Sequence, residues 1–169
     1  MKSINKRIKL LFIRVGIKHQ NIFGTLSKCI LFLIIASCNS ITKGGELSSD
    51  DRLRIESLGL LEKDEQIIKF YSEFKNSVAG NFFTDKRLAK YWQDEKNDEK
   101  NQLNSAYYFE IISIDTVCYA GLTYSPYMLV TKKDSSSFKV CFDGNRKELN
   151  KTFTEAIELW HKNRSKTKI

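Results

Sequence analysis

The sequence predicts an α+β fold that is mainly β, a small antiparallel sandwich or barrel of six or seven strands capped by a C-terminal amphipathic helix. Segments rich in β-branched and aromatic residues recur between residues 66 and 144, as expected of strands. After them, apolar residues recur at three- and four-residue steps, which places them on one side of a helix. These helical positions are Leu149, Phe153, Ala156, Ile157 and Trp160.

The first half of the predicted domain holds a short helix followed by strands. Residues 48–61 open with serine and aspartate at possible N-cap positions and end near Gly59, which predicts a helix. Residues 66–74 predict one strand. Residues 79–94 predict either two strands that turn near Asp85-Lys86 or one long bent strand.

The second half is predicted to be strands connected by polar turns. Residues 94–104 are charged and predict a solvated loop, whereas residues 107–122 predict a further strand. Residues 127–133 and 137–144 flank the polar turn Asp134-Ser135-Ser136, and this arrangement predicts a hairpin.

Two finer features are predicted near the C-terminus. Phe138, Val140 and Phe142 alternate along the last strand and should share its core side, which places Cys141 on the opposite, more polar face. At the start of the helix, Thr152 followed by Glu155 fits a capping box, and Asn150 fits equally well as the cap.

The net charge of +8 comes from the N-terminal leader and not from the predicted domain. Seven of the 28 basic residues and none of the 20 acidic residues precede Cys38, which leaves 21 basic and 20 acidic residues from there onward. This balance argues against nucleic-acid binding. Residues 29–37 are an uncharged run, too short for a transmembrane helix, which needs roughly 20 apolar residues. A basic stretch followed by such a run is the layout of a secretory signal.

The leader ends in Ile35-Ala36-Ser37-Cys38, which resembles the lipobox of bacterial lipoproteins. The resemblance implies cleavage before Cys38 and acylation of its thiol, so that acyl chains (palmitate among them) hold the protein at a membrane. Two acyl chains give stable attachment where one gives only marginal binding. The alternative is an uncleaved amphipathic anchor or signal anchor, in which Cys38 is an ordinary residue.

The predicted organisation has four parts: a signal peptide over residues 1–37, a flexible tether over 38–48, a globular domain over 49–163 and a basic tail over 164–169. The residues after Cys38 contain neither an immediate aspartate nor an acidic run. By resemblance to lipoprotein sorting signals, this favours the outer membrane, with the domain facing the periplasm.

Strands followed by one amphipathic C-terminal helix are the element order of the pleckstrin-homology (PH) superfold, and residues 62–162 resemble bacterial PH-like and GRAM-like domains. The resemblance rests on the turn Thr84-Asp85-Lys86-Arg87-Leu88 and on the step Glu110-Ile111-Ile112-Ser113-Ile114. It implies a bent pair of sheets whose open end is covered by the helix. The alternative is another α+β lipoprotein fold with a curved sheet.

Three basic residues are candidates for contact with an anionic ligand: Lys86, Arg87 and Lys90. The resemblance suggests this, because PH-like domains can bind anionic head groups through the corresponding turn. The alternative is ordinary surface charge, since Asp85 and Asp94 offset the basic residues.

Cys118 and Cys141 are the cysteines that remain, because Cys29 leaves with the leader and Cys38 is acylated. In an oxidising envelope compartment they could form a disulfide, or they could stay as two unpaired thiols. His161 lies in the last helical turn and is the one histidine outside the leader, so the sequence supports neither a zinc site nor a serine-hydrolase triad.

Together these patterns predict a non-enzymatic, membrane-anchored module that binds a protein or peptide partner in the cell envelope, without cofactor, metal or nucleic acid. One alternative is a lipid or anionic-ligand binder that uses Lys86 and Arg87. Another is a carboxylate-based envelope hydrolase, although acids such as Asp94 and Glu99 lie in a loop where they are more typical of solvation.

Overall fold

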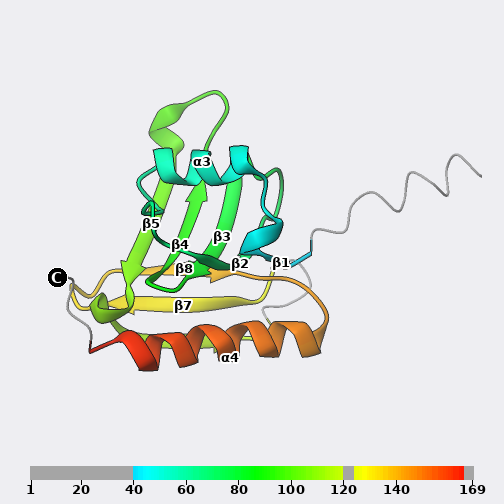
Figure 1. The fold of residues 1–169 in the computed structure, drawn as a ribbon. Coiled ribbons are helices and arrows are strands. Elements are labelled where there is room, and N and C mark those ends of the chain that lie inside the picture. Colours follow the sequence, from blue (N-terminus) through cyan, green and yellow to red (C-terminus); the bar gives the residue numbers. More distant parts are fainter. Residues whose placement is uncertain (1–39, 120–123, 166–169) are drawn as a thin grey trace, which may run out of the picture. The chain divides into compact units, whose positions relative to one another are not determined.

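The computed structural model describes residues 40–119 and 124–165, which Figure 1 shows as a ribbon. Five antiparallel strands form one sheet in the order β1-β2-β3-β4-β5, and three form a second sheet in the order β6-β7-β8. The first sheet consists of β1 (Thr42–Lys43), β2 (Ile67–Tyr71), β3 (Ala79–Thr84), β4 (Arg87–Trp92) and β5 (Gln102–Tyr107). The second consists of β6 (Ile111–Val117), β7 (Tyr127–Lys132) and β8 (Ser137–Cys141). The helices are α3 (Ser49–Ser57) and α4 (Arg146–Asn163), with short 3-10 turns η2 (Gly44–Glu46), η3 (Asp98–Lys100) and η4 (Tyr108–Glu110).

The central strand β3 is buried on both faces, because the first sheet carries a hydrophobic cluster on each side. Neighbouring residues of β3 alternate between the clusters, since Phe83 belongs to one and Phe82 to the other. The cluster around Phe83 includes residues of the second sheet and of α4. The cluster around Phe82 includes Ile55 of α3. The first sheet therefore lies between α3 and the pair formed by the second sheet and α4, whose strands cross its own steeply (Figure 1).

Helix α3 has the caps that its sequence predicts. The Ser48 side chain accepts a hydrogen bond of 3.1 Å from the Asp51 backbone N–H, which satisfies a donor in the first turn. The chain leaves the helix through Gly59, whose φ of 72° is a left-handed conformation that glycine adopts without steric cost. The predicted helix over 48–61 and its end near this glycine are confirmed.

Helix α4 begins earlier than predicted. Its N-cap is Asn145, whose side chain accepts a hydrogen bond of 3.0 Å from the Glu148 backbone N–H. The predictions of Asn150 or Thr152 as the cap are therefore wrong. Both lie inside the helix, and Thr152 is buried against the sheet with 1% exposure. Asn145 and Glu148 show the same three-residue spacing as a capping box, seven residues or about two helical turns before the predicted pair.

The predicted hairpins are confirmed, whereas the strands between them are shifted. Strands β3 and β4 turn at Asp85-Lys86, so residues 79–94 form two strands and not one bent strand. Strands β7 and β8 turn through Ser135, whose φ is 66°. The prediction of a loop over 94–104 is wrong at its end, because Gln102 already begins β5. The predicted strand over 107–122 is interrupted by η4.

The segment predicted as the tether's end is part of the folded domain. Ile41 is 7% exposed and belongs to the core cluster of α4. Thr42 and Lys43 form β1, which pairs with β2. The prediction of a flexible tether over 38–48 is therefore wrong for residues 41–48. The leader, Cys38 and residues 166–169 of the predicted tail lie outside the described residues.

The predicted fold class is confirmed: a mainly β, PH-like architecture with two antiparallel sheets and a C-terminal amphipathic helix. Apart from the two-residue strand β1, four strands of the first sheet are followed by three of the second and then by α4. This is the order and number of strands expected of a PH-like domain. Within the described part of the chain, no helix has the length and apolar character needed to cross a membrane.

The packing around β3 predicts that a methyl group at Gly80 is not tolerated. An ideal Cβ there would lie 2.4 Å from Tyr91 Cε1 and 2.7 Å from Phe70 Cε2, both in the buried cluster under α3. Gly80→Ala should lower the free energy of unfolding by about 1–3 kcal/mol through overpacking. Gly45→Ala is the matched control, because a Cβ at Gly45 meets nothing within 4 Å. Urea unfolding of the purified protein checks this, and equal stability of the two variants would contradict the packing.

Candidate functional site

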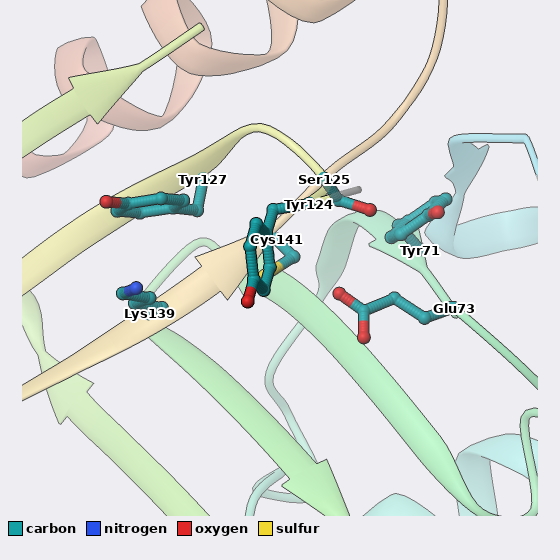
Figure 2. Close-up of a pocket in the computed structure, with 7 residues that line it drawn as sticks. All are labelled: Tyr71, Glu73, Tyr124, Ser125, Tyr127, Lys139 and Cys141. Atoms are coloured by element: carbon teal, nitrogen blue, oxygen red, sulfur yellow. The ribbon is translucent and has the colours of Figure 1, made fainter. Parts of the chain in front are cut away.

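An open cleft of about 670 Å³ lies where the outer face of the second sheet meets the end of β2. It combines aromatic rings, hydroxyl groups, a carboxylate, an ammonium group and a thiol, as Figure 2 shows. The lining residues are Tyr71, Glu73, Tyr124, Ser125, Tyr127, Lys139 and Cys141.

The second sheet fixes one side of this cleft. Tyr127 of β7 and Cys141 of β8 are cross-strand partners. Lys139 lies two residues before Cys141, on the same outer face of the strand. Its Nζ atom is 4.3 Å from the centre of the Tyr127 ring, a cation–π contact that restrains both side chains. The Cys141 backbone N–H donates to Asn81 Oδ1 at 3.0 Å, which ties this edge to β3 of the first sheet.

The other side of the cleft comes from the end of β2 and the start of β7. Tyr71 closes β2, and its hydroxyl group forms a hydrogen bond with Ser125. Glu73 follows two residues later, and its carboxylate points toward Cys141 in Figure 2. Tyr124 is 75% exposed at the mouth of the cleft. The carboxylate of Glu73 and the ammonium group of Lys139 therefore stand on opposite sides of Cys141.

The electrostatic environment keeps the Cys141 thiol protonated. Burial, followed by the negative charge and hydrogen bond of Glu73, raises the pKa of the thiol to about 12. Because the thiolate is the nucleophilic form, Cys141 is a poor nucleophile at neutral pH. Burial also raises the pKa of the Tyr71 hydroxyl group. Cys141 and Tyr71 can therefore donate and accept hydrogen bonds to a ligand, and Cys141 is not activated as a nucleophile.

Two basic residues of the predicted anionic-ligand site, Lys86 and Arg87, have acidic partners within the domain. Arg87 donates to Glu65 through Nε at 2.9 Å and through Nη2 at 2.7 Å, a bidentate pair in which the Glu65 side chain is 0% exposed. Lys86 Nζ lies 3.0 Å from carboxylate oxygens of both Glu62 and Asp64. Hydrogen bonds from Tyr107 and Lys86 lower the pKa of Glu62 to about 2.

Lys90 is separated from the other two basic residues by the pleat of β4. It follows Arg87 by three residues and therefore points to the opposite face of the strand. Its charge acts instead on Cys141, whose pKa it lowers slightly against the effect of burial. Lys90 therefore does not share a face with Lys86 and Arg87, and contact of these residues with an anionic ligand stays a prediction.

Of the two alternatives for Cys118 and Cys141, the disulfide is not formed in this structure. Both are free cysteines within the described residues. Cys118 follows β6 whereas Cys141 ends β8, so β7 lies between them. Two strand spacings amount to about 10 Å, beyond the Cα separation that a disulfide can bridge. The Cys118 Sγ atom contacts Asn150 of α4 at 4.0 Å, whereas Cys141 faces the cleft. The alternative of two unpaired thiols describes the structure.

The remaining candidate residues have local structural roles. His161 is exposed in the last turn of α4 and stacks against Trp160 at a ring separation of 4.8 Å. Asp94 Oδ1 accepts hydrogen bonds of 3.0 Å from the backbone N–H groups of Lys96 and Asn97, which shapes the charged loop. Among the described residues, no three histidine, cysteine, aspartate or glutamate side chains are grouped as a metal site would need.

Sequence reasoning predicted the orientation of one cleft residue and missed the cleft itself. Alternation along β8 places Cys141 opposite to the core residues Phe138 and Val140, as observed. The same alternation indicates that Lys139 points outward. Nothing local in the sequence, however, indicates that Glu73, in the bend after β2, approaches Cys141.

Comparison with known proteins gives a distant likeness in fold. No protein-family model and no curated protein matches this chain. A crystal structure of a DUF1696 family protein with a pleckstrin-homology domain from Shewanella loihica is similar over 70% of this chain and 98% of that one, with 16% identity and a TM-score of 0.44. A pleckstrin homology domain from Shewanella amazonensis is similar over 75% and 97%, with 14% identity and a TM-score of 0.44. At these scores the likeness carries no argument about function, and the fold assignment rests on the strand order itself.

The buried pair of Arg87 and Glu65 predicts a specific pattern of stability. Arg87→Met should cost about 3–5 kcal/mol, because it leaves the Glu65 carboxylate buried without its cation. The double variant Arg87→Met/Glu65→Leu should recover most of that loss. Lys86→Met, whose side chain is 31% exposed, should cost about 0–1 kcal/mol and serves as the control. Denaturant unfolding measures all three, and a single Arg87→Met variant as stable as the double one would contradict the role of the pair.

Proposed function

We propose that this chain is a bacterial envelope lipoprotein whose exported domain is a non-enzymatic binding module, with a polypeptide segment of an envelope partner occupying the cleft between Glu73 and Lys139. Acyl chains on Cys38 hold the domain at the membrane. The residues after Cys38 favour the outer membrane with the domain facing the periplasm, by resemblance to lipoprotein sorting signals.

Anchoring is supported by the arrangement of the leader. A basic stretch precedes an uncharged run that is too short to span a bilayer, and small residues lead directly to Cys38. The folded domain begins at Ile41, so a cut before Cys38 removes no residue of the described core.

The cleft carries the binding proposal, because it presents recognition groups that the domain does not use for its own core. Glu73 and Tyr124 are exposed, and Lys139 is held over the Tyr127 ring and not in an ion pair within the described residues. Tyrosine provides a large contact area and a hydroxyl group at low entropic cost, so it is frequent in protein recognition sites. A polypeptide can offer a basic group to Glu73, an acidic group to Lys139 and backbone amides to the hydroxyl groups between them.

The two alternative functions receive less support from the same residues. An anionic-ligand site at Lys86 and Arg87 would have to displace three carboxylates that already neutralise these cations. A hydrolase would need an activated group, yet burial and Glu73 keep Cys141 protonated. Asp94 is engaged in shaping its loop. We therefore favour a binding module over both alternative functions.

Anchoring predicts a definite mass for the protein isolated from membranes of its native host. The wild-type chain should lack residues 1–37 and carry the mass of acyl groups at its new N-terminus. Cys38→Ser should stay uncleaved and unacylated, because the thiol that accepts the glyceride is missing. Ser40→Ala is the matched control and should be processed normally. Intact-mass spectrometry measures this, and an unmodified full-length wild-type chain would contradict the anchor.

The cleft predicts charge-dependent partner binding. Lys139→Glu should reduce recovery of cross-linked envelope proteins about tenfold, because it reverses one of the two charges and removes the contact with Tyr127. Lys100→Glu makes the same charge change in the distant η3 turn and should leave recovery unchanged. Quantitative mass spectrometry of cross-linked material from intact cells compares them. Equal recovery from wild type and Lys139→Glu would contradict binding of the partner in the cleft.

A further inference from the structure

The folded domain begins very close to the proposed anchor. Ile41 is 7% exposed and lies in the core cluster with Phe142 and Leu149. From Ile41 back to Cys38 there are only three Cα steps of about 3.8 Å each, so the two Cα atoms are at most about 11 Å apart. An acylated Cys38 would therefore hold the surface around Ile41 against the bilayer and would not let the domain swing freely.

The surface around Ile41 is the N-terminal end of α4. The Cβ position of Gly144 lies 3.6 Å from Ile41 Cδ1, one residue before the N-cap of the helix. The Phe142 backbone N–H donates to Pro126 at 3.0 Å, which brings the start of β7 to the same end. Figure 1 shows β1 and the first turn of α4 on the same side of the domain. Ile41, three residues after Cys38, therefore lies beside one end of a helix of 18 residues, about 27 Å long.

Cations predominate on the outer face of α4, three of them in its first two turns and one in its last. Its exposed charged side chains are four cations and one carboxylate: Arg146, Lys147, Lys151, Lys162 and Glu158. None of these cations takes part in an ion pair with another described residue. The acidic residue of the first turn, Glu148, is instead engaged with the cap residue Asn145. Tyr124 is exposed beside the start of β7 at the same end, and tyrosine is favoured at membrane interfaces.

The side of the domain opposite to α4 carries more acidic than basic residues in its η3 loop. The loop around η3 carries Asp94, Glu95, Asp98 and Glu99 against two lysines, Lys96 and Lys100. This loop lies at the end of the first sheet remote from α4 in Figure 1. The charges of the domain are therefore polarised, with the cations on the side of the anchor.

We infer that the outer face of α4 lies on the surface of an anionic bilayer, with its first turn nearest the acylated Cys38. This inference rests on the proposed lipidation. Basic side chains are attracted to anionic lipid within about a Debye length, which is about 8–10 Å at physiological salt. The short link keeps the first turns of α4 within this range, whereas the acidic η3 loop is directed away from the membrane.

Lysine footprinting of the unmutated, lipidated chain tests this orientation. The protein purified from native membranes is placed in nanodiscs of phosphatidylglycerol and phosphatidylcholine in equal parts, or of phosphatidylcholine alone, and acetylated with a membrane-impermeant reagent. Lys147 and Lys151 should react about threefold or more slowly in the anionic nanodiscs. Lys96 and Lys100 should react equally in both. Arg146→Gln/Lys147→Gln should restore the reactivity of Lys151, whereas Lys96→Gln/Lys100→Gln should not.

The outcomes separate this inference from the proposed function. Intact mass of the same sample reports acylation independently of orientation. An acylated chain whose Lys147 and Lys151 react equally in both nanodiscs overturns the orientation and leaves the anchor standing. If Lys96 and Lys100 reacted more slowly instead, the side of the domain with the η3 loop would lie on the membrane, and this too would overturn the proposed orientation. A chain without acyl groups overturns the anchor and, with it, the inference.

Discussion

The requirement to bury β3 on both faces organises this protein. Phe82 and Phe83 are adjacent in sequence and both fully buried, so each face of the first sheet needs a cover. The second sheet and α4 cover one face. The other is covered by α3 and Leu60-Leu61, which precede all the long strands. The segment from Ile41 to Leu61 is therefore a structural part of the domain, and this shortens the link to any anchor at Cys38.

The sequence correctly predicted those helices and turns that are determined by residues close to one another in the chain. Helix α3 with its end at Gly59, and the β7–β8 hairpin around Ser135, follow from capping and turn residues within a few positions. The tether prediction failed because Thr42 pairs with Phe70, a contact 28 residues away that no local pattern reveals. The start of α4 was missed for a different reason. Thr152 is a residue type that often caps helices, but here it is buried inside the helix, and Asn145 is the N-cap.

The candidate site shows the same division between local and long-range causes. The outward direction of Cys141 follows from alternation, but the cleft also needs Glu73 from the bend after β2. The basic turn at Lys86 and Arg87 was recognised from its residues, yet its partners Glu62 and Glu65 lie more than 20 positions earlier. Those carboxylates convert a candidate ligand site into an internal ion-pair network, which stabilises the cover over the first sheet.

The short link to Cys38 depends on the segment before β2 being folded onto the sheet, because Ile41 lies in the core and Thr42–Lys43 pairs with β2. Amide hydrogen exchange of the full chain, followed by mass spectrometry, tests this directly. Residues 49–61 should exchange much more slowly than residues 95–101, with β3 the slowest, because helical and sheet hydrogen bonds must open first. Exchange of residues 49–61 at the rate of an unstructured peptide, beside a protected β3, would contradict the account.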